Sequence, residues 1–225
     1  MKRLAMAVGI VLAAACAAWT AWGAAAPGAD APAPKPDKDG WYDLFNGKDL
    51  AGWKVSENPD TFRGEDGAIV AHGPRAHAFY VGPVADHDFK NFELQADVKT
   101  APKANSGIYF HTAWQESGYP AKGHEAQVNN THGDWRKTGS LYAVQDVKES
   151  PVKDGEWFHC EIAVRGKRIV LKVNGRVTAD WTEPENYKHP DRPQRGLSHG
   201  TFALQGHDPE SQVWFKNLRV RPLAD

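Results

Sequence analysis

The sequence has little cysteine, no excess of charge of either sign, and no helical periodicity after its first residues. Its two cysteines are Cys16 and Cys160. Because Cys16 lies in an apolar N-terminal stretch that we interpret as an export signal, Cys160 has no partner for an intramolecular disulfide. The fold is therefore expected to depend on its hydrophobic core, with Cys160 as an inert thiol on a packing face.

The charges nearly cancel, since 27 basic and 28 acidic residues give a formal net charge of −1. This balance offers no attraction for a polyanion, so nucleic acid is excluded as an expected partner. The histidines lack the His-x-His and His-Glu-x-x-His spacings of metal sites, and no calcium-loop motif is present. We therefore predict no metal and no cofactor. The alternative is a divalent-cation site that the fold assembles from His111, Glu125 and His207.

The first residues have the three parts of a secretory signal peptide. Two basic residues precede an apolar stretch over 4–22, and three alanines at 24–26 offer a small-residue cleavage site. We predict a signal peptide over 1–26 and an exported mature protein with no membrane span. A transmembrane anchor is the alternative, because a spanning helix needs roughly 18 apolar residues. A lipoprotein attached through Cys16 is less favoured, because the alanines at 13–15 include no large apolar side chain.

Residues 27–39 are rich in proline and alanine and are predicted to form a linker, because this composition buries little apolar surface. The remainder, 40–225, has the length of one domain with a single core. Short alternating apolar runs, separated by Gly, Asn and Asp, predict an all-β jelly-roll sandwich of two antiparallel sheets. The predicted strands are 41–45, 68–72, 92–98, 107–111, 125–129, 141–144, 158–164, 168–173, 177–181, 201–205 and 213–219.

The clearest local signal is a set of three adjacent antiparallel strands over 157–178. Apolar residues alternate along 158–164, the chain turns at 165–167, and apolar residues alternate again along 169–173. Asn174-Gly175 is the dipeptide preferred in two-residue hairpin turns, because both residues tolerate positive φ.

Two of the predicted strands have one polar face. In 105–111 and in 125–129, apolar and polar residues alternate with the period of a half-buried strand. The proline-rich stretch 183–195 is predicted to be a long surface loop that walls a site. Pairing the two strands would gather one polar surface, which is our candidate site: Tyr109, His111, Glu125 and Gln127.

A series of short motifs runs in order through the predicted domain. They are Leu44-Phe45-Asn46-Gly47-Lys48, Asn105-Ser106-Gly107-Ile108, Glu125-x-Gln127, Thr138-Gly139-Ser140-Leu141-Tyr142, Val173-Asn174-Gly175, Leu204-Gln205-Gly206-His207 and Phe215-Lys216-Asn217-Leu218-Arg219-Val220. This series resembles the bacterial 3-keto-disaccharide hydrolase family. The sequence departs from the family pattern at His111, where members often carry arginine, and at 205–208.

The resemblance implies a concanavalin A-like lectin and glucanase fold in a periplasmic or secreted bacterial protein. It also implies activity on glycosides whose sugar ring carries a ketone at carbon 3. Such a ketone acidifies the hydrogen on carbon 2, so a base could remove that proton and expel the oxygen on carbon 1; hydration would complete a net hydrolysis. Glu125 is the predicted base, and His111 is the predicted acid or a second base.

The remaining polar and aromatic residues are predicted to bind the oxidised sugar through neutral hydrogen-bonding groups and ring stacking. Ordinary two-carboxylate glycosidase chemistry is the alternative mechanism. Amides occupy the other positions of the Glu125 strand face, but Glu116, Asp134 or Asp146 could supply the second carboxylate from loops. A non-catalytic carbohydrate-binding module and a cell-surface interaction domain are the alternative functions. The predicted substrate-binding residues are Asn105, Tyr109, Gln127, Tyr142, Gln205, His207 and Trp114.

Overall fold

The computed structural model describes residues 34–189 and 192–225. The predicted signal peptide, the lipoprotein alternative at Cys16 and most of the predicted linker lie outside these residues. Within the described residues, no helix is both long enough and apolar enough to cross a membrane.

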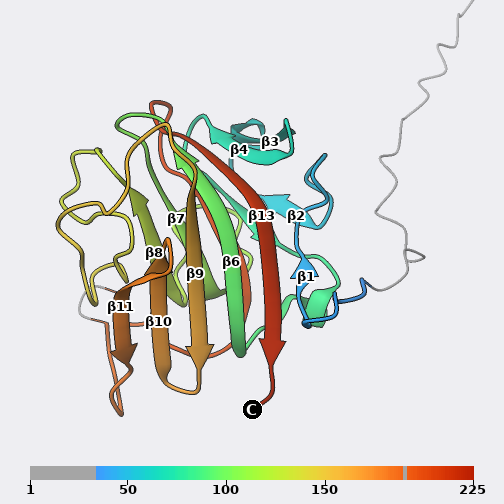
Figure 1. Ribbon diagram of the computed structural model, residues 1–225, viewed down its shortest axis with the longest axis vertical. Helices are drawn as coiled ribbons and strands as arrows, with labels where there is room; N and C mark the ends of the chain where they lie inside the picture. Colours follow the sequence, from blue (N-terminus) through green and yellow to red (C-terminus); the bar gives the residue numbers. More distant parts are fainter. Residues whose placement is uncertain (1–33, 190–191) are drawn as a thin grey trace, which may run out of the picture. The chain divides into compact units, whose positions relative to one another are not determined.

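The described chain forms two antiparallel sheets, and the all-β sandwich prediction is confirmed. The outer sheet has the order β11-β10-β9-β6-β13-β4-β3, with β1 beside β13, and the site sheet has the order β2-β5-β12-β7-β8 (Figure 1). The strands are β1 (Tyr42–Asp43), β2 (Trp53–Val55), β3 (Phe62–Glu65), β4 (Ala68–His72), β5 (Ala76–Tyr80), β6 (Asn91–Thr100), β7 (Asn105–Thr112), β8 (His124–Asn129), β9 (Phe158–Arg165), β10 (Arg168–Val173), β11 (Arg176–Thr182), β12 (Thr201–Gly206) and β13 (Gln212–Leu223), with 3₁₀ turns η1 (Pro59–Thr61) and η2 (Val84–His87).

The core lies where the alternating apolar residues of the two sheets meet. On the outer sheet, Leu94 of β6 is opposite Ile162 of β9, and both are buried. On the site sheet, Ile108 and Leu204 are opposite each other and belong to the same core. Burial raises the pKa of the Cys160 thiol to about 12, which keeps it protonated and fits the prediction of an inert side chain.

Most predicted strands are present, and the predicted run β9-β10-β11 is confirmed. The predicted strand 141–144 is wrong, because Leu141 makes only isolated bridges and Ala143 has a φ of 58°, which turns the chain. Strands β2, β3 and β5 are not among the predicted strands. The residues of β5 are all buried, so they show no apolar and polar alternation.

A bulge near the end of β7 reverses its alternation. Tyr109 pairs with Ala203 and Thr112 pairs with Thr201, so two residues of β7 oppose one residue of β12. His111 has a φ of 56° within this bulge. Gly123 lies against it so closely that a Cβ there would be 2.0 Å from the Phe110 carbonyl oxygen. The bulge therefore turns His111 away from the face that carries Tyr109.

Candidate active site

A pocket of about 190 Å³ opens on the site sheet. Strands β7, β8 and β12 supply its floor, and the loops that follow β7 and β8, together with the loop before β12, supply its walls. This volume is below the roughly 300 Å³ at which pockets for drug-sized ligands begin. The lining residues are Asn105, Tyr109, Tyr119, Glu125, Gln127, Asp134, Tyr142, Arg192, Gln205 and His207.

Glu125 lies on the floor of this pocket, and its side chain is 4% exposed. It is directly opposite Tyr109 in the β7–β8 pairing, and the Tyr109 hydroxyl donates a hydrogen bond to its carboxylate. Gln205 Nε2 lies 3.0 Å from the Tyr109 hydroxyl and 3.4 Å from Glu125 Oε1. Three neighbouring strands thus supply one connected group of polar side chains around a single carboxylate.

Arg195 is the cation nearest to this carboxylate among the described residues. Its side chain is 2% exposed, and its Nη2 lies 3.5 Å from Glu125 Oε2. Burial raises the pKa of Glu125, while Arg195 and the Tyr109 hydroxyl partly oppose that rise. A carboxylate with a raised pKa is a stronger base than a solvated one, which suits proton abstraction near neutral pH.

Gly107 makes room for the Glu125 carboxylate. It lies on β7, two residues before Tyr109, and a Cβ built on it would be only 2.5 Å from Glu125 Oε1. A methyl group at this position would therefore displace the carboxylate.

We expect Gly107→Ala to lower kcat/KM by roughly tenfold to a hundredfold, because a displacement of about 1 Å can weaken catalysis to that extent. The matched control is Gly166→Ala in the β9–β10 turn, where a Cβ meets no atom within 4 Å but the φ of +56° is strained. The control should lose about 1 kcal/mol of unfolding free energy and keep its kcat/KM. Equal kinetics in both variants would show that Gly107 does not position Glu125.

The amide side chains on the same face offer both donors and acceptors. The side-chain amides of Asn105 and Gln127 are 3.0 Å apart, and turning the Gln127 amide over brings its N–H to 3.2 Å from Glu125 Oε1. Gln205 Oε1 is buried and accepts no hydrogen bond from the described residues. A sugar hydroxyl in the pocket would satisfy this acceptor.

Most predicted site residues are brought together by the fold. Strands β7, β8 and β12 gather five of them, because alternate residues of paired strands share one face, while His207 follows β12 and Tyr142 lies in the loop after β8. The predicted residues that line the pocket are Asn105, Tyr109, Glu125, Gln127, Tyr142, Gln205 and His207.

His111 does not reach the pocket, which corrects its predicted place on the polar face. Its ring contacts Phe92 and Phe110, with ring centroids 5.6 and 5.9 Å away. Its Nε2 donates to the Lys90 carbonyl at 2.9 Å, and its Nδ1 accepts from the Ser198 N–H at 3.2 Å. The bulge in β7 is the physical reason, and it leaves both ring nitrogens bonded to the backbone. The site considered for a divalent ion, His111 with Glu125 and His207, is therefore not formed.

Trp114 also lies outside the pocket lining. Its ring packs edge-on against Phe79 at 5.3 Å, and Lys54 Nζ lies 3.9 Å from the ring centroid. The side chain covers a neighbouring part of the site sheet and remains 37% exposed.

Tyr119, Arg192 and Arg195 were not among the predicted site residues. Arg192 and Arg195 belong to or end the proline-rich loop 183–195, which was predicted to wall a site without a role for either residue. Tyr119 lies in the loop after β7, whereas Asp134, which was considered as a second carboxylate, lies in the loop after β8. Loop residues have no periodicity that would aim them at a particular face.

His77 of β5 lies under the pocket and is fully buried. Its ring makes edge contacts with Tyr109 and Tyr119, at centroid distances of 5.6 and 5.7 Å. Burial lowers the pKa of His77 to about 3, and burial likewise lowers the pKa of His111 to about 4. Both rings are neutral in the folded protein at pH 7.

Acid should therefore destabilise the fold before the carboxylates titrate. Above pH 6.5 these two histidines are unprotonated in both the folded and the unfolded protein. Below pH 6.5 they bind protons in the unfolded chain but not in the folded one. The free energy of unfolding therefore falls by up to about 1.4 kcal/mol per pH unit for each histidine. Urea unfolding between pH 7 and pH 5 measures this slope. His77→Phe should reduce it, whereas exposed His72→Gln should not; an unchanged slope in His77→Phe would contradict the assignment.

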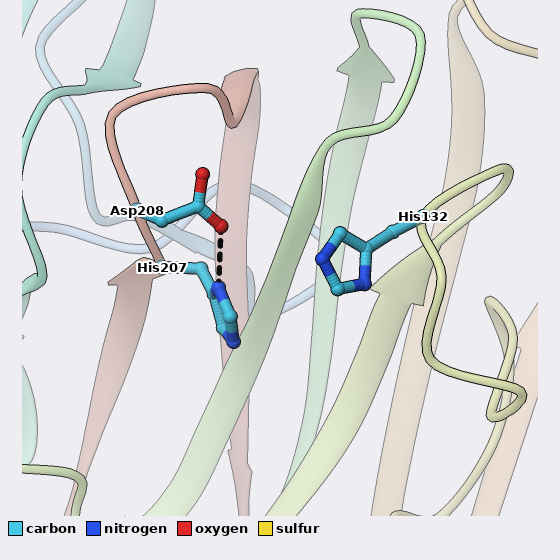
Figure 2. Close-up of side chains that lie close together, drawn as sticks. All are labelled: His132, His207 and Asp208. Atoms are coloured by element: carbon cyan, nitrogen blue, oxygen red, sulfur yellow. Dashed lines mark hydrogen bonds and ion pairs between the residues drawn. The ribbon is translucent and has the colours of Figure 1, made fainter.

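A cluster of His132, His207 and Asp208 lies beside the pocket, with one ligand atom of each within 4.8 Å of the others and a hydrogen bond between His207 and Asp208 (Figure 2). His132 Nδ1 accepts the Asp134 N–H at 3.1 Å. His207 Nδ1 is bonded to Asp208 Oδ2 at 2.6 Å. The Nδ1 atoms of both histidines and the Asp208 carboxylate thus have hydrogen-bond partners within the chain, and the Nε2 atoms are the ring nitrogens left to take a ligand.

Comparison with known proteins identifies a matching family model, a sequence relative and a solved structure of similar fold. Residues 40–221 match the family model described as a 3-keto-alpha-glucoside-1,2-lyase-like domain. A 3-keto-disaccharide hydrolase of Bacteroides thetaiotaomicron is 28% identical, over 83% of this chain and 80% of the relative. A candidate glycosyl hydrolase of Parabacteroides distasonis superposes with a TM-score of 0.70 and 27% identity, over 83% of this chain and 95% of that one.

A more distant likeness concerns the fold alone. The carbohydrate-binding module CBM66 of Bacillus subtilis superposes with a TM-score of 0.52 at 12% identity, over 77% of this chain and 96% of the module. The same two-sheet architecture thus occurs in a protein described as a binding module.

Proposed function

This chain belongs to the 3-keto-alpha-glucoside-1,2-lyase-like family, and on that premise we propose that it cleaves 3-keto-glucosides between carbon 1 and the leaving group. The observation that carries the proposal is Glu125, a buried carboxylate with a raised pKa on the floor of a polar pocket. Perturbed carboxyl groups of this kind concentrate at catalytic sites.

The chemistry follows from the ketone at carbon 3. Removal of the carbon 2 proton gives an enolate whose charge is shared with the ketone oxygen, and the enolate then expels the oxygen on carbon 1. Glu125 is the base of this step. Water added across the resulting double bond between carbons 1 and 2 would make the overall reaction a hydrolysis.

The other lining groups suit the changes in charge during this step. Arg192 lines the pocket and supplies a positive charge for the enolate oxygen. Arg195 and Tyr109 orient Glu125 through its two oxygens. The neutral amides of Gln127 and Gln205 match the neutral hydroxyl groups of a sugar.

The size of the pocket indicates how much of the substrate it encloses. A volume of about 190 Å³ accommodates one sugar ring and leaves a second unit outside. We therefore propose that the oxidised ring is enclosed and that the leaving group is bound at the opening.

Ordinary hydrolysis by two carboxylates is the second candidate, because Asp134 also lines the pocket. Asp134 Oδ1 accepts the Arg136 N–H at 2.9 Å and lies 3.9 Å from Arg136 Nη1, so this carboxylate is already held by a cation. Ordinary hydrolysis would not need the ketone. The two mechanisms thus differ in the substrate that they require.

The test compares a 3-keto-glucoside with the same glucoside before oxidation. The wild-type protein should release the leaving group from the keto-glucoside alone. Release from both compounds, with loss of both activities in Asp134→Asn, would favour the two-carboxylate mechanism. Binding of either compound without release of the leaving group would show that the protein is a carbohydrate-binding module and not an enzyme.

Export is part of the proposal and rests on the sequence of residues 1–26. The full chain expressed in a Gram-negative bacterium should be recovered from the periplasm or the medium with a new N-terminus near residue 27. Cys16→Ala should not change this result. Retention of the intact leader, or loss of processing in Cys16→Ala, would point instead to a membrane anchor or a lipoprotein.

A further inference from the structure

His207 and Asp208 form a hydrogen-bonded pair at the end of β12. His207 is the first residue after this strand and lines the pocket on the same face as Gln205. Its Nδ1 lies 2.6 Å from Asp208 Oδ2, and the other ring nitrogen, Nε2, points away from Asp208 (Figure 2). The pair therefore fixes which nitrogen of the ring is available for other contacts.

Asp208 is itself held in place by its neighbours. Its Oδ1 accepts the N–H groups of Glu210 and Ser211 at 2.8 and 3.0 Å, and its Oδ2 accepts the Ser211 hydroxyl at 2.9 Å. Burial alone would raise the pKa of Asp208, but the hydrogen bonds from His207, Ser211 and Glu210 outweigh it and lower that pKa. An anionic Asp208 accepts the hydrogen of His207 Nδ1 and so leaves Nε2 as the nitrogen that faces a ligand.

The pair stands between two hollows of the surface. On one side is the pocket with Glu125, and His207 is near enough for its charge to act on the Glu125 pKa. On the other side is a more open hollow of about 750 Å³, whose lining includes Asp208 and His132. The His132 and His207 ring centroids are 5.5 Å apart. A leaving group that the enclosed pocket does not hold would find room in this hollow, next to the His207–Asp208 pair.

We propose that His207 is the catalytic acid that protonates the leaving group and that Asp208 is its positioning residue. This inference rests on the proposed function. Glu125 takes the carbon 2 proton, the electron pair of that C–H bond forms the double bond to carbon 1, and the C1–O bond breaks. The leaving oxygen takes the proton from His207 Nε2. The products are protonated Glu125, a neutral His207 ring, the enone and the free alcohol.

Hydration reverses these proton transfers and restores the starting state. His207 Nε2 takes a proton from water as the hydroxyl group adds to carbon 1, and Glu125 returns its proton to carbon 2. Both side chains therefore end the cycle as they began it, and no further reactant is needed beyond water.

The test varies the leaving group while the oxidised sugar stays the same. A 4-nitrophenyl 3-keto-glucoside loses a leaving group that departs without protonation, whereas the methyl 3-keto-glucoside needs an acid. We expect His207→Gln to lower kcat/KM for the methyl compound by about 10²–10⁴-fold and for the nitrophenyl compound by no more than about tenfold. Asp208→Asn should show the same selective loss at smaller size, because its side chain keeps its shape but loses the charge.

His199 and Asp88 provide the control, since their exposed pair has the same geometry, with Nδ1 2.7 Å from Asp88 Oδ1. His199→Gln and Asp88→Asn should leave both rates unchanged. Equal losses on both substrates in His207→Gln and Asp208→Asn would overturn the inference. So would activity that a chelator removes and a divalent cation restores, since the ring would then serve a cation. If the wild-type protein cleaves neither compound, the proposed function itself fails.

Discussion

Replacing Glu125 with glutamine is expected to lower kcat/KM for a 3-keto-glucoside by about 10²–10⁴-fold, the range that general bases contribute. Glutamine has nearly the same shape and can still meet Tyr109 and Gln205, but it cannot accept the carbon 2 proton. Because the substitution leaves the buried Arg195 guanidinium without its anion, it should also lower the free energy of unfolding, and rates are compared under conditions where urea unfolding shows both proteins folded. Initial rates of leaving-group release measure the effect.

Glu161→Gln is the matched control for this substitution. Glu161 lies on β9 of the outer sheet, where it pairs with Lys172 at 3.2 Å and has no contact with the pocket. This variant should keep its kcat/KM. A Glu125→Gln protein that retains wild-type activity would remove Glu125 from the mechanism.

Replacing Arg195 with methionine is expected to lower the free energy of unfolding by about 3–5 kcal/mol, because it leaves the Glu125 carboxylate buried without its cation. Arg195 also lowers the pKa of Glu125, so its loss should raise that pKa further. The base is active when deprotonated, and the acid limb of the kcat/KM profile should therefore move to higher pH. Urea unfolding and a pH–rate profile measure the two effects.

A double-mutant cycle separates the ion pair from the packing of the arginine. The protein with both Arg195→Met and Glu125→Gln should be more stable than the sum of the single effects, because no unpaired charge remains. Arg168→Met is the control, since its pair with Asp180 is exposed and such pairs contribute about 0–1 kcal/mol. Additive losses in the cycle would show that Arg195 and Glu125 are not coupled.

The strands were predictable where one face packs and the other is solvated. Along β9 the buried Phe158 and Ile162 alternate with more exposed residues, so the period of two was visible. The floor of the pocket followed from the same rule, because Tyr109 and Glu125 each continue the alternation of their strands. Strand β5, in contrast, is buried on both faces and carries His77, and no alternation marks it.

The position of His111 and the pairing of Arg195 with Glu125 depend on contacts between residues that are distant in the sequence. The place of His111 is set by the bulge between β7 and β12 and by the close approach of Gly123, neither of which the alternating pattern of 105–111 contains. Arg195 reaches Glu125 from the end of a loop across 70 positions of the chain. Loop geometry decides which charged side chains pair in this way. Local composition predicts where a loop lies, but not which of its residues reaches Glu125.

The most direct test of the central claim uses a 3-keto-glucoside with deuterium at carbon 2. If Glu125 removes that hydrogen, the wild-type protein should release the leaving group more slowly from the deuterated substrate than from the ordinary one. The deuterium should pass to water during turnover, after correction for exchange without enzyme. Equal rates, with the deuterium retained at carbon 2 of the released sugar, would contradict elimination and leave direct attack at carbon 1 as the reaction.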